Sequence, residues 1–115
     1  MTQAPQLVVS DNPGAGRFEA HLGDQLAGVA EYQLAHDLIV FTHTEVESAF
    51  EGRGVGSALA AHALDEVRAA GERRVLPLCP FIRAWIQRHP EYLDITYGAA
   101  APTQPPTEQS NRAVQ

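Results

Sequence analysis

Three glycines fall within five positions, at Gly52, Gly54 and Gly56, where a β-prone segment gives way to a helical one. Glycines that open a helix after a strand let several backbone N–H groups point at one anion, and the helix dipole adds to the attraction. Such an anion could be the pyrophosphate of a nucleotide, bound without any lysine. The alternative is that the glycines only form a tight strand-to-helix turn.

Two other phosphate-binding loops do not fit this segment. A P-loop requires Lys and then Ser or Thr after its last glycine, but Gly56 is followed by Ser57 and all eight cationic side chains of the protein are arginines. A dinucleotide fingerprint requires a glycine or alanine at Ser57 or Leu59, and a parallel βαβ setting. Neither condition is met, so the segment predicts an anion site of another kind.

Cys79, the single cysteine, lies directly before Pro80 and a segment of helical periodicity. Its thiol is therefore expected at the N-terminus of a helix, where the dipole stabilises a thiolate. A lone cysteine is otherwise a small buried apolar residue, and both interpretations stay open. His43, whose imidazole can exchange a proton near neutral pH, alternates with Phe41 and Glu45, which predicts that the three side chains share one face of a strand.

Strands in the first half of the chain must position these residues. Four β-prone runs are joined by short connections, and they are expected to pair antiparallel because a parallel crossover needs about a dozen residues or more. The runs are residues 6–11, 17–22, 26–34 and 38–46. They predict a four-stranded meander.

Helical periodicity follows the glycines, and Gly71 is a natural stop. The apolar residues of this period are Val55, Leu59, Ala63, Val67 and Ala70. Residues 73–79 predict a fifth strand, which the helix can place parallel to the fourth. Pro80 suits the first position of a second helix, which Pro90 stops. The expected fold is therefore α+β.

Composition narrows the class of protein. The formal net charge is −6, which makes nucleic acid and anionic membranes unlikely partners. No run has the length of a membrane span and no basic region precedes an apolar stretch, so a cytoplasmic location is expected. Five histidines are present without metal-ligand spacing, so no metal is expected. We expect one compact domain over residues 1–97 and a disordered tail over residues 98–115.

The segment EGRGVGSALAAHAL, from Glu51, resembles motif A of the GNAT superfamily of acetyl-CoA-dependent N-acetyltransferases, usually written Q/R-x-x-G-x-G/A. Gly54 and Gly56 match its two glycines, whereas Glu51 stands where Gln or Arg is usual. Together with HTEV (43–46), CPF (79–81) and HPEY (89–92), in this order, the chain resembles a compact, YjdJ-type subfamily of GNAT-like proteins. The resemblance covers nearly all of the folded part.

This resemblance implies the three-layer-like GNAT fold, in which the fourth and fifth strands splay apart and the pantetheine arm of coenzyme A lies between them. The coenzyme would be bound by Val46, Arg53, Gly54, Val55, Gly56, Ser57 and Ala58. Cys79 would lie near the thioester as the suspected catalytic residue. His43 would act as a base toward Cys79 or toward an acceptor amine, and Glu45 is the alternative base.

The resemblance leaves the acceptor open, because the connection between the first two strands is only NPGAG (12–16) and lacks the helices that build much of the acceptor site in larger relatives. The partners expected are a coenzyme A thioester and an amine, either a small molecule or a protein group. Transfer could be direct or pass through Cys79. The rival function is a coenzyme A-binding protein without turnover, either an acyl-CoA sensor or a module that protects its thiol.

Overall fold

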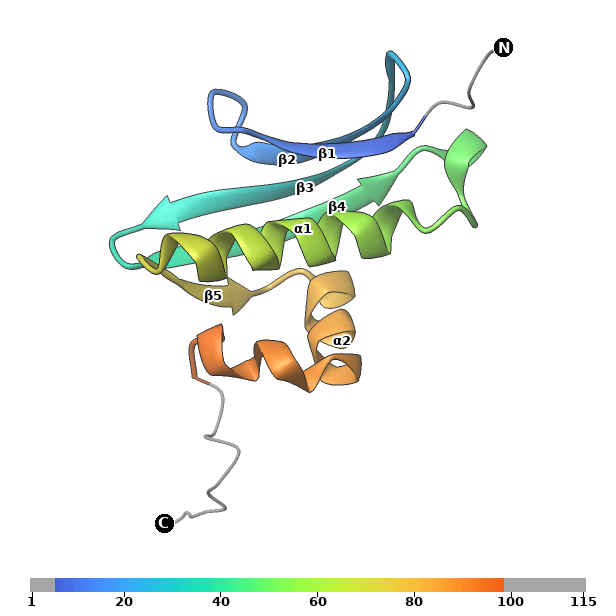
Figure 1. The fold of residues 1–115 in the computed structure, drawn as a ribbon. Helices are drawn as coiled ribbons and strands as arrows, with labels where there is room; N and C mark the ends of the chain where they lie inside the picture. Colours follow the sequence, from blue (N-terminus) through green and yellow to red (C-terminus); the bar gives the residue numbers. More distant parts are fainter. Residues whose placement is uncertain (1–5, 99–115) are drawn as a thin grey trace.

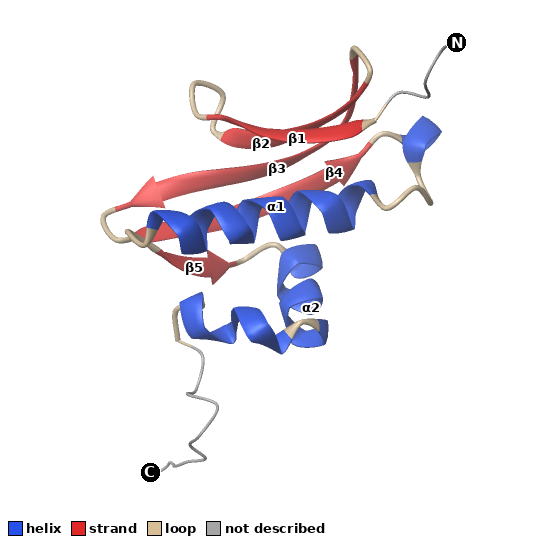
Figure 2. Cartoon of the chain, in the orientation of Figure 1, coloured by secondary structure: helices blue, strands red, loops and turns tan. Residues whose placement is uncertain are grey.

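The computed structural model describes residues 6–98, which form a five-stranded sheet with helices packed against it (Figures 1 and 2). The predicted tail lies, after Gly98, outside the described residues. The strands follow one another across the sheet in chain order. They are β1 (Leu7–Asn12), β2 (Arg17–Leu22), β3 (Gln25–Ala35), β4 (Leu38–Val46) and β5 (Arg74–Pro77).

The topology confirms the α+β fold class. Strands β1 to β4 pair antiparallel, and β5 pairs parallel to β4 through the register Leu38↔Arg74 to Phe41↔Pro77. Strand β5 ends at Pro77, which has no N–H to continue the ladder. The N–H groups of Leu78 and Cys79 then both donate to the carbonyl of Phe41, at 3.0 and 2.9 Å. The two strands therefore part after Phe41.

Residues 6–98 also contain four helical segments: η1 (Ser48–Phe50), α1 (Val55–Ala70), α2 (Pro80–Arg88) and η2 (Pro90–Ile95). Helix α1 begins and ends at glycines in the left-handed conformation, Gly54 with φ 77° and Gly71 with φ 67°. At its C-terminal end the N–H of Gly71 donates to the carbonyl of Val67 at 3.1 Å. The predicted bounds of α1 are thus confirmed, and α2 begins at Pro80 as expected.

Helix α1 lies across one face of the sheet (Figure 1). Buried side chains of the sheet, of α1 and of the apolar stripe of α2 form one hydrophobic core. The largest fully buried side chains are Phe41, Leu59, Leu64, Ile82 and Val75. Trp85, expected to pack between helix and sheet, is buried and stacks on His89 with ring centroids 3.8 Å apart.

A β-bulge in the β3–β4 pair changes which side chains of β4 face the core. The register runs Glu31↔His43 and then Tyr32↔Phe41, so Thr42 has no partner. Phe41 is fully buried, whereas His43 pairs with Glu31 and is exposed. The prediction that Phe41, His43 and Glu45 share one face is therefore wrong, because the extra residue reverses the alternation between Phe41 and His43.

Two polar contacts tie η2 to α1. Arg68 forms a bidentate pair with Asp94, at 2.6 and 3.0 Å, and also donates to the carbonyl of Glu91. The hydroxyl of Tyr92 donates to the carboxylate of Asp65 at 2.7 Å. The Arg68 guanidinium holds the pKa of Asp94 below its ordinary value of 3.8. The fold therefore favours the charged form of this carboxyl.

This pair predicts a pH-dependent contribution of Asp94 to stability. A lowered folded-state pKa means that the contribution is present above the unfolded-state pKa and is lost as pH falls through the folded-state pKa. Asp94→Asn should therefore be less stable than wild type near neutral pH, and the difference should shrink at acidic pH. Urea unfolding over a pH series measures this, with Asp24→Asn in an exposed turn as the control. A difference that stays constant with pH contradicts the assignment.

Candidate functional site

The N-terminus of α1 presents unpaired backbone donors. The first intrahelical bond runs from the N–H of Ala58 to the carbonyl of Gly54, at 3.0 Å. The N–H groups of Val55, Gly56 and Ser57 precede it and have no intrahelical acceptor. Among the described residues no side chain caps this end, and its first turn holds no acidic residue. Donors and helix dipole together favour an anion here, whereas Glu51, which also lines the adjoining pocket, opposes it unless its side chain turns to solvent.

A pocket of about 240 Å³ adjoins these donors. Of the residues predicted to bind the coenzyme, those that line it are Val46, Gly54, Val55, Gly56 and Ser57. Ala58 does not line it, and its N–H is already bonded. Arg53 also lies outside the lining, with its guanidinium 5.7 Å from the ring centroid of Phe50, which does line the pocket. Arg53 therefore stands at the pocket's edge.

Glycine is required at each of these three positions for a different physical reason. Gly52 and Gly54 have φ values of 82° and 77°, which non-glycine residues adopt only at a cost, and a Cβ at either would meet no atom within 4 Å. At Gly56 a Cβ would lie 2.8 Å from the Phe81 ring. Phe81 also lines the pocket. Sequence reasoning missed this role because no spacing links the starts of two separate helices.

Cys79 is the N-cap residue of α2, and it is 3% exposed. This confirms the predicted position at a helix start. Its Sγ lies 3.3 Å from the Oγ1 of Thr44. Thr44 was not singled out in the sequence, because regular alternation would have put it on the face opposite to Phe41. The bulge instead directs both Phe41 and Thr44 toward the core.

His43 and Glu45 lie together on the other face of β4. Their side chains are 55% and 66% exposed, with Nε2 and Oε1 3.3 Å apart. A shallow pocket of about 140 Å³ lies on this face and is lined by Glu45, Glu31 and Glu47, among others. The structure therefore pairs His43 with Glu45 and not with Cys79, so the expected role of His43 as a base toward Cys79 lacks the necessary contact.

The parting of β4 and β5 leaves one backbone edge of β4 without a strand partner. Beyond Phe41, no described strand pairs with this side of β4, and α2 packs beside it instead. This unpaired edge of β4 runs from Phe41, whose carbonyl accepts a bond from the buried Cys79, to Val46. Val46 lines the pocket at the start of α1. A linear ligand anchored by an anionic group at α1 would find main-chain hydrogen-bonding groups along this edge.

A family model described as GCN5-related N-acetyl-transferase matches residues 17–95. The chain belongs to the GCN5-related N-acetyltransferase family. Family members typically use acetyl-CoA as the acyl donor, so an acyl-CoA and an acceptor are implied as partners. The match leaves the YjdJ-type subfamily untested. A search among curated protein sequences finds no match.

A comparison with solved structures finds a protein that has the same fold as this chain. The NMR structure of a GCN5-like protein from Staphylococcus aureus superposes with a TM-score of 0.64 at 18% sequence identity. The similarity covers 87% of this chain and 97% of that one.

Within residues 6–98, no helix is long and apolar enough to cross a membrane. In the same residues no group of three or more His, Cys, Asp or Glu side chains could hold a metal ion.

Proposed function

We propose that this protein transfers the acetyl group of acetyl-CoA to a primary amine. The observation that carries the proposal is the set of unpaired N–H donors at Val55, Gly56 and Ser57, which open onto a pocket in a member of an acetyltransferase family. Their geometry suits a pyrophosphate. The residues of this chain that fit the coenzyme are therefore these three, with Gly54 and Val46 beside them.

The unpaired edge of β4 extends this proposal toward the reacting end. The coenzyme supplies an activated acyl thioester when bound. The backbone between Val46 and Phe41 is suited to hold its extended arm, because the parting of β4 and β5 leaves this edge open beside α2. The half-buried Thr44 hydroxyl and the buried Cys79 thiol would then form a wall beside the acyl group.

The acceptor amine, we infer, approaches from the exposed face of β4. His43 and Glu45 lie there, and Glu31 and Glu47, which with Glu45 outnumber the one cation of this pocket, Arg17, add negative charge that attracts a cationic amine. The His43–Glu45 pair takes a proton from the ammonium group, and the freed nitrogen attacks the thioester carbonyl. The carbon–sulfur bond breaks, and the second proton that the nitrogen loses as the amide forms passes to the departing sulfur, so the coenzyme leaves as a thiol.

Burial of Cys79 favours this direct route over an acetyl-cysteine intermediate. The thiol is 3% exposed, its side-chain contact is the neutral hydroxyl of Thr44, and the His43–Glu45 pair lies across the sheet. A nucleophilic thiol is activated by an adjacent base, a cationic partner or a helix N-terminus, and it must also reach the substrate. Cys79 has the helix N-terminus, but its burial keeps it from the substrate. We therefore assign Cys79 to the wall of the acyl site.

The test is an acetyl-transfer assay with acetyl-CoA and a panel of amines, combined with rapid-quench mass spectrometry of the intact protein. We expect an acetylated amine, no acetyl adduct on the protein, and turnover by Cys79→Ser. An adduct on Cys79 that an amine discharges would establish the covalent route instead. Coenzyme binding with no product from any amine would favour the rival function of a non-catalytic coenzyme A-binding protein.

A further inference from the structure

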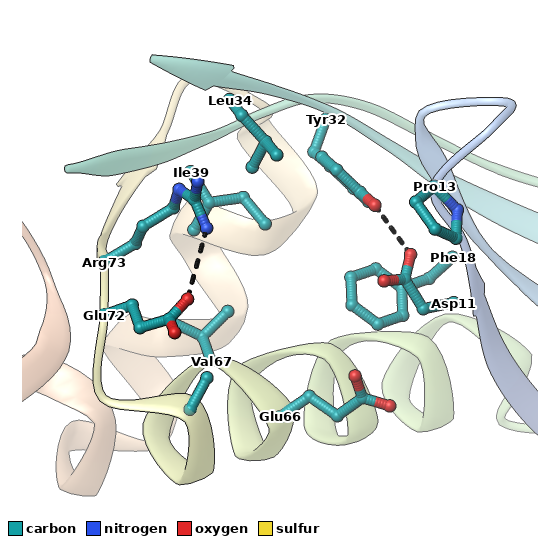
Figure 3. Close-up of a pocket in the computed structure, with 11 residues that line it drawn as sticks. Asp11, Pro13, Phe18, Tyr32, Leu34, Ile39, Glu66, Val67, Glu72 and Arg73 are labelled. Atoms are coloured by element: carbon teal, nitrogen blue, oxygen red, sulfur yellow. Dashed lines mark hydrogen bonds and ion pairs between the residues drawn. The ribbon is translucent and has the colours of Figure 1, made fainter. Parts of the chain in front are cut away.

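A further hollow, whose lining residues Figure 3 shows, lies at the C-terminal end of α1. The glycine-rich loop lies at the other end of this helix. Its volume is about 170 Å³, and its walls come from β1 to β4, the C-terminal half of α1 and the loop that leads into β5. Much of its lining is apolar: Phe18, Tyr32, Leu34, Ile39 and Val67. Leu34 is 53% exposed although its side chain borders this concave surface. An apolar group bound here would cover it.

The rim of the hollow is negatively charged. Carboxylates of Asp11, Glu66 and Glu72 line it, against one guanidinium, that of Arg73. The Arg73 Nη1 approaches Glu72 only at 3.7 Å, and its buried Nε has no acceptor among the described residues. The C-terminal end of α1 adds the negative pole of its helix dipole. Asp11 and Glu66, the two carboxylates that Arg73 does not approach, favour a cation on their side of the hollow, whereas the Arg73 Nε favours an acceptor on its own side.

Asp11 and Tyr32 form the polar corner opposite Arg73 (Figure 3). The Tyr32 hydroxyl donates to Oδ1 of Asp11 at 2.6 Å, which leaves the second carboxylate oxygen available as an acceptor. Burial, together with the Asp11 and Glu66 carboxylates, raises the pKa of Tyr32 to about 12. Tyr32 thus remains a neutral donor that fixes the orientation of Asp11.

The hollow is distinct from the proposed acetyl-transfer site. The fully buried ring of Phe41 packs behind it, with centroids 6.3 Å from that of Phe18 and 6.2 Å from that of Tyr32. Cys79 lies where the strands part, after Phe41 in the β4–β5 register. A molecule in the hollow would be separated from that thiol by the core.

We propose that this hollow binds a small amphipathic cation, consisting of a compact aromatic or hydrocarbon body and one ammonium group. The body covers Leu34 and packs on Phe18 and Val67, and the ammonium group lies between Asp11 and Glu66. Apolar pockets with a few convergent polar groups are the usual form of small-molecule sites. This inference does not depend on coenzyme binding or on acetyl transfer.

The test is an amide NMR titration of the full-length protein with three probes of similar shape: phenethylamine, phenethyl alcohol and phenylpropionate. Phenethylamine should shift the amides of Leu34 and Val67 saturably, with a dissociation constant on the order of millimolar. The alcohol should bind at least about twofold more weakly and the anion more weakly still. Shifts that do not saturate, or that are equal for the amine and the alcohol, overturn the proposal.

Substitutions test which side chains contact the bound phenethylamine. Glu66→Gln and Asp11→Asn should each weaken phenethylamine binding by about two- to fivefold, the effect expected of partly exposed charge pairs. Asp24→Asn removes the same charge from the exposed β2–β3 turn, at the end of this strand pair away from the hollow. This variant should bind phenethylamine like wild type. Leu34→Ser should weaken the amine and the alcohol alike. Wild-type affinity in both carboxylate variants would overturn the proposed cation site, whatever the result of the acetyl-transfer assay.

Discussion

Gly28→Ala is expected to destabilise the protein by about 2–3 kcal/mol, because it adds a methyl group where backbone and helix leave no space. A Cβ at this position would lie 2.8 Å from the carbonyl oxygen of Glu45, 2.9 Å from Cγ1 of Val55 and 3.3 Å from Cδ1 of Leu59. The first of these atoms belongs to a paired strand and cannot rotate away. The melting temperature should therefore fall by about 10 °C or more.

The same substitution should weaken coenzyme binding, because Val55 is the first residue of α1 and carries one of the unpaired N–H donors. Gly14→Ala is the matched control, since a Cβ there meets only the Asn12 side chain at 3.7 Å. Thermal unfolding followed by circular dichroism gives the stability of both variants. Equal melting temperatures for the Gly28 and Gly14 variants would show that α1 does not pack on β3 as described.

Replacing both members of the polar pair on β4, as His43→Gln with Glu45→Gln, should lower kcat by about a hundredfold to ten-thousandfold. The reason is that proton transfer from the acceptor ammonium would lose its base. Coenzyme affinity should stay unchanged, because neither side chain lines the pocket at α1. The single variants show which of the two groups takes the proton, since its loss carries the larger effect on kcat.

The matched control removes a similar exposed pair elsewhere. His36 and Asp37 lie 3.8 Å apart in the β3–β4 turn, and both are largely exposed. His36→Asn with Asp37→Asn should retain wild-type kcat. Steady-state kinetics with a common amine compares the two double variants. If the β4 variant keeps its kcat, the acceptor does not use the exposed face of β4.

The elements of this fold follow closely from local sequence patterns. The helical period from Val55, bounded by Gly54 and Gly71, sets α1 correctly, and short connections force the antiparallel meander. These features depend on residues near one another in the chain, which is why the sequence alone predicts them. The fifth strand, predicted over residues 73–79, is shorter than expected: β5 ends at Pro77, which has no N–H to extend the ladder.

The arrangement of the candidate site depends on contacts between distant segments. No glycine or proline marks the bulge at Thr42, and the bulge reverses the alternation that placed His43 on the same face as Phe41. The contact between Gly56 and Phe81 joins two helices that a strand separates. Periodicity therefore predicts which residues are near the site, but register and packing decide which of them meet.

The central claim is that main-chain amides at the start of α1 bind the diphosphate of the coenzyme. Amide NMR of the full-length protein, titrated with coenzyme A and separately with pantetheine, tests it most directly, because pantetheine lacks that diphosphate. We expect coenzyme A to produce large, saturable shifts at Val55, Gly56 and Ser57, and pantetheine to leave these three amides nearly unchanged. Unchanged amides in the presence of coenzyme A, or equal shifts with both compounds, would contradict the claim.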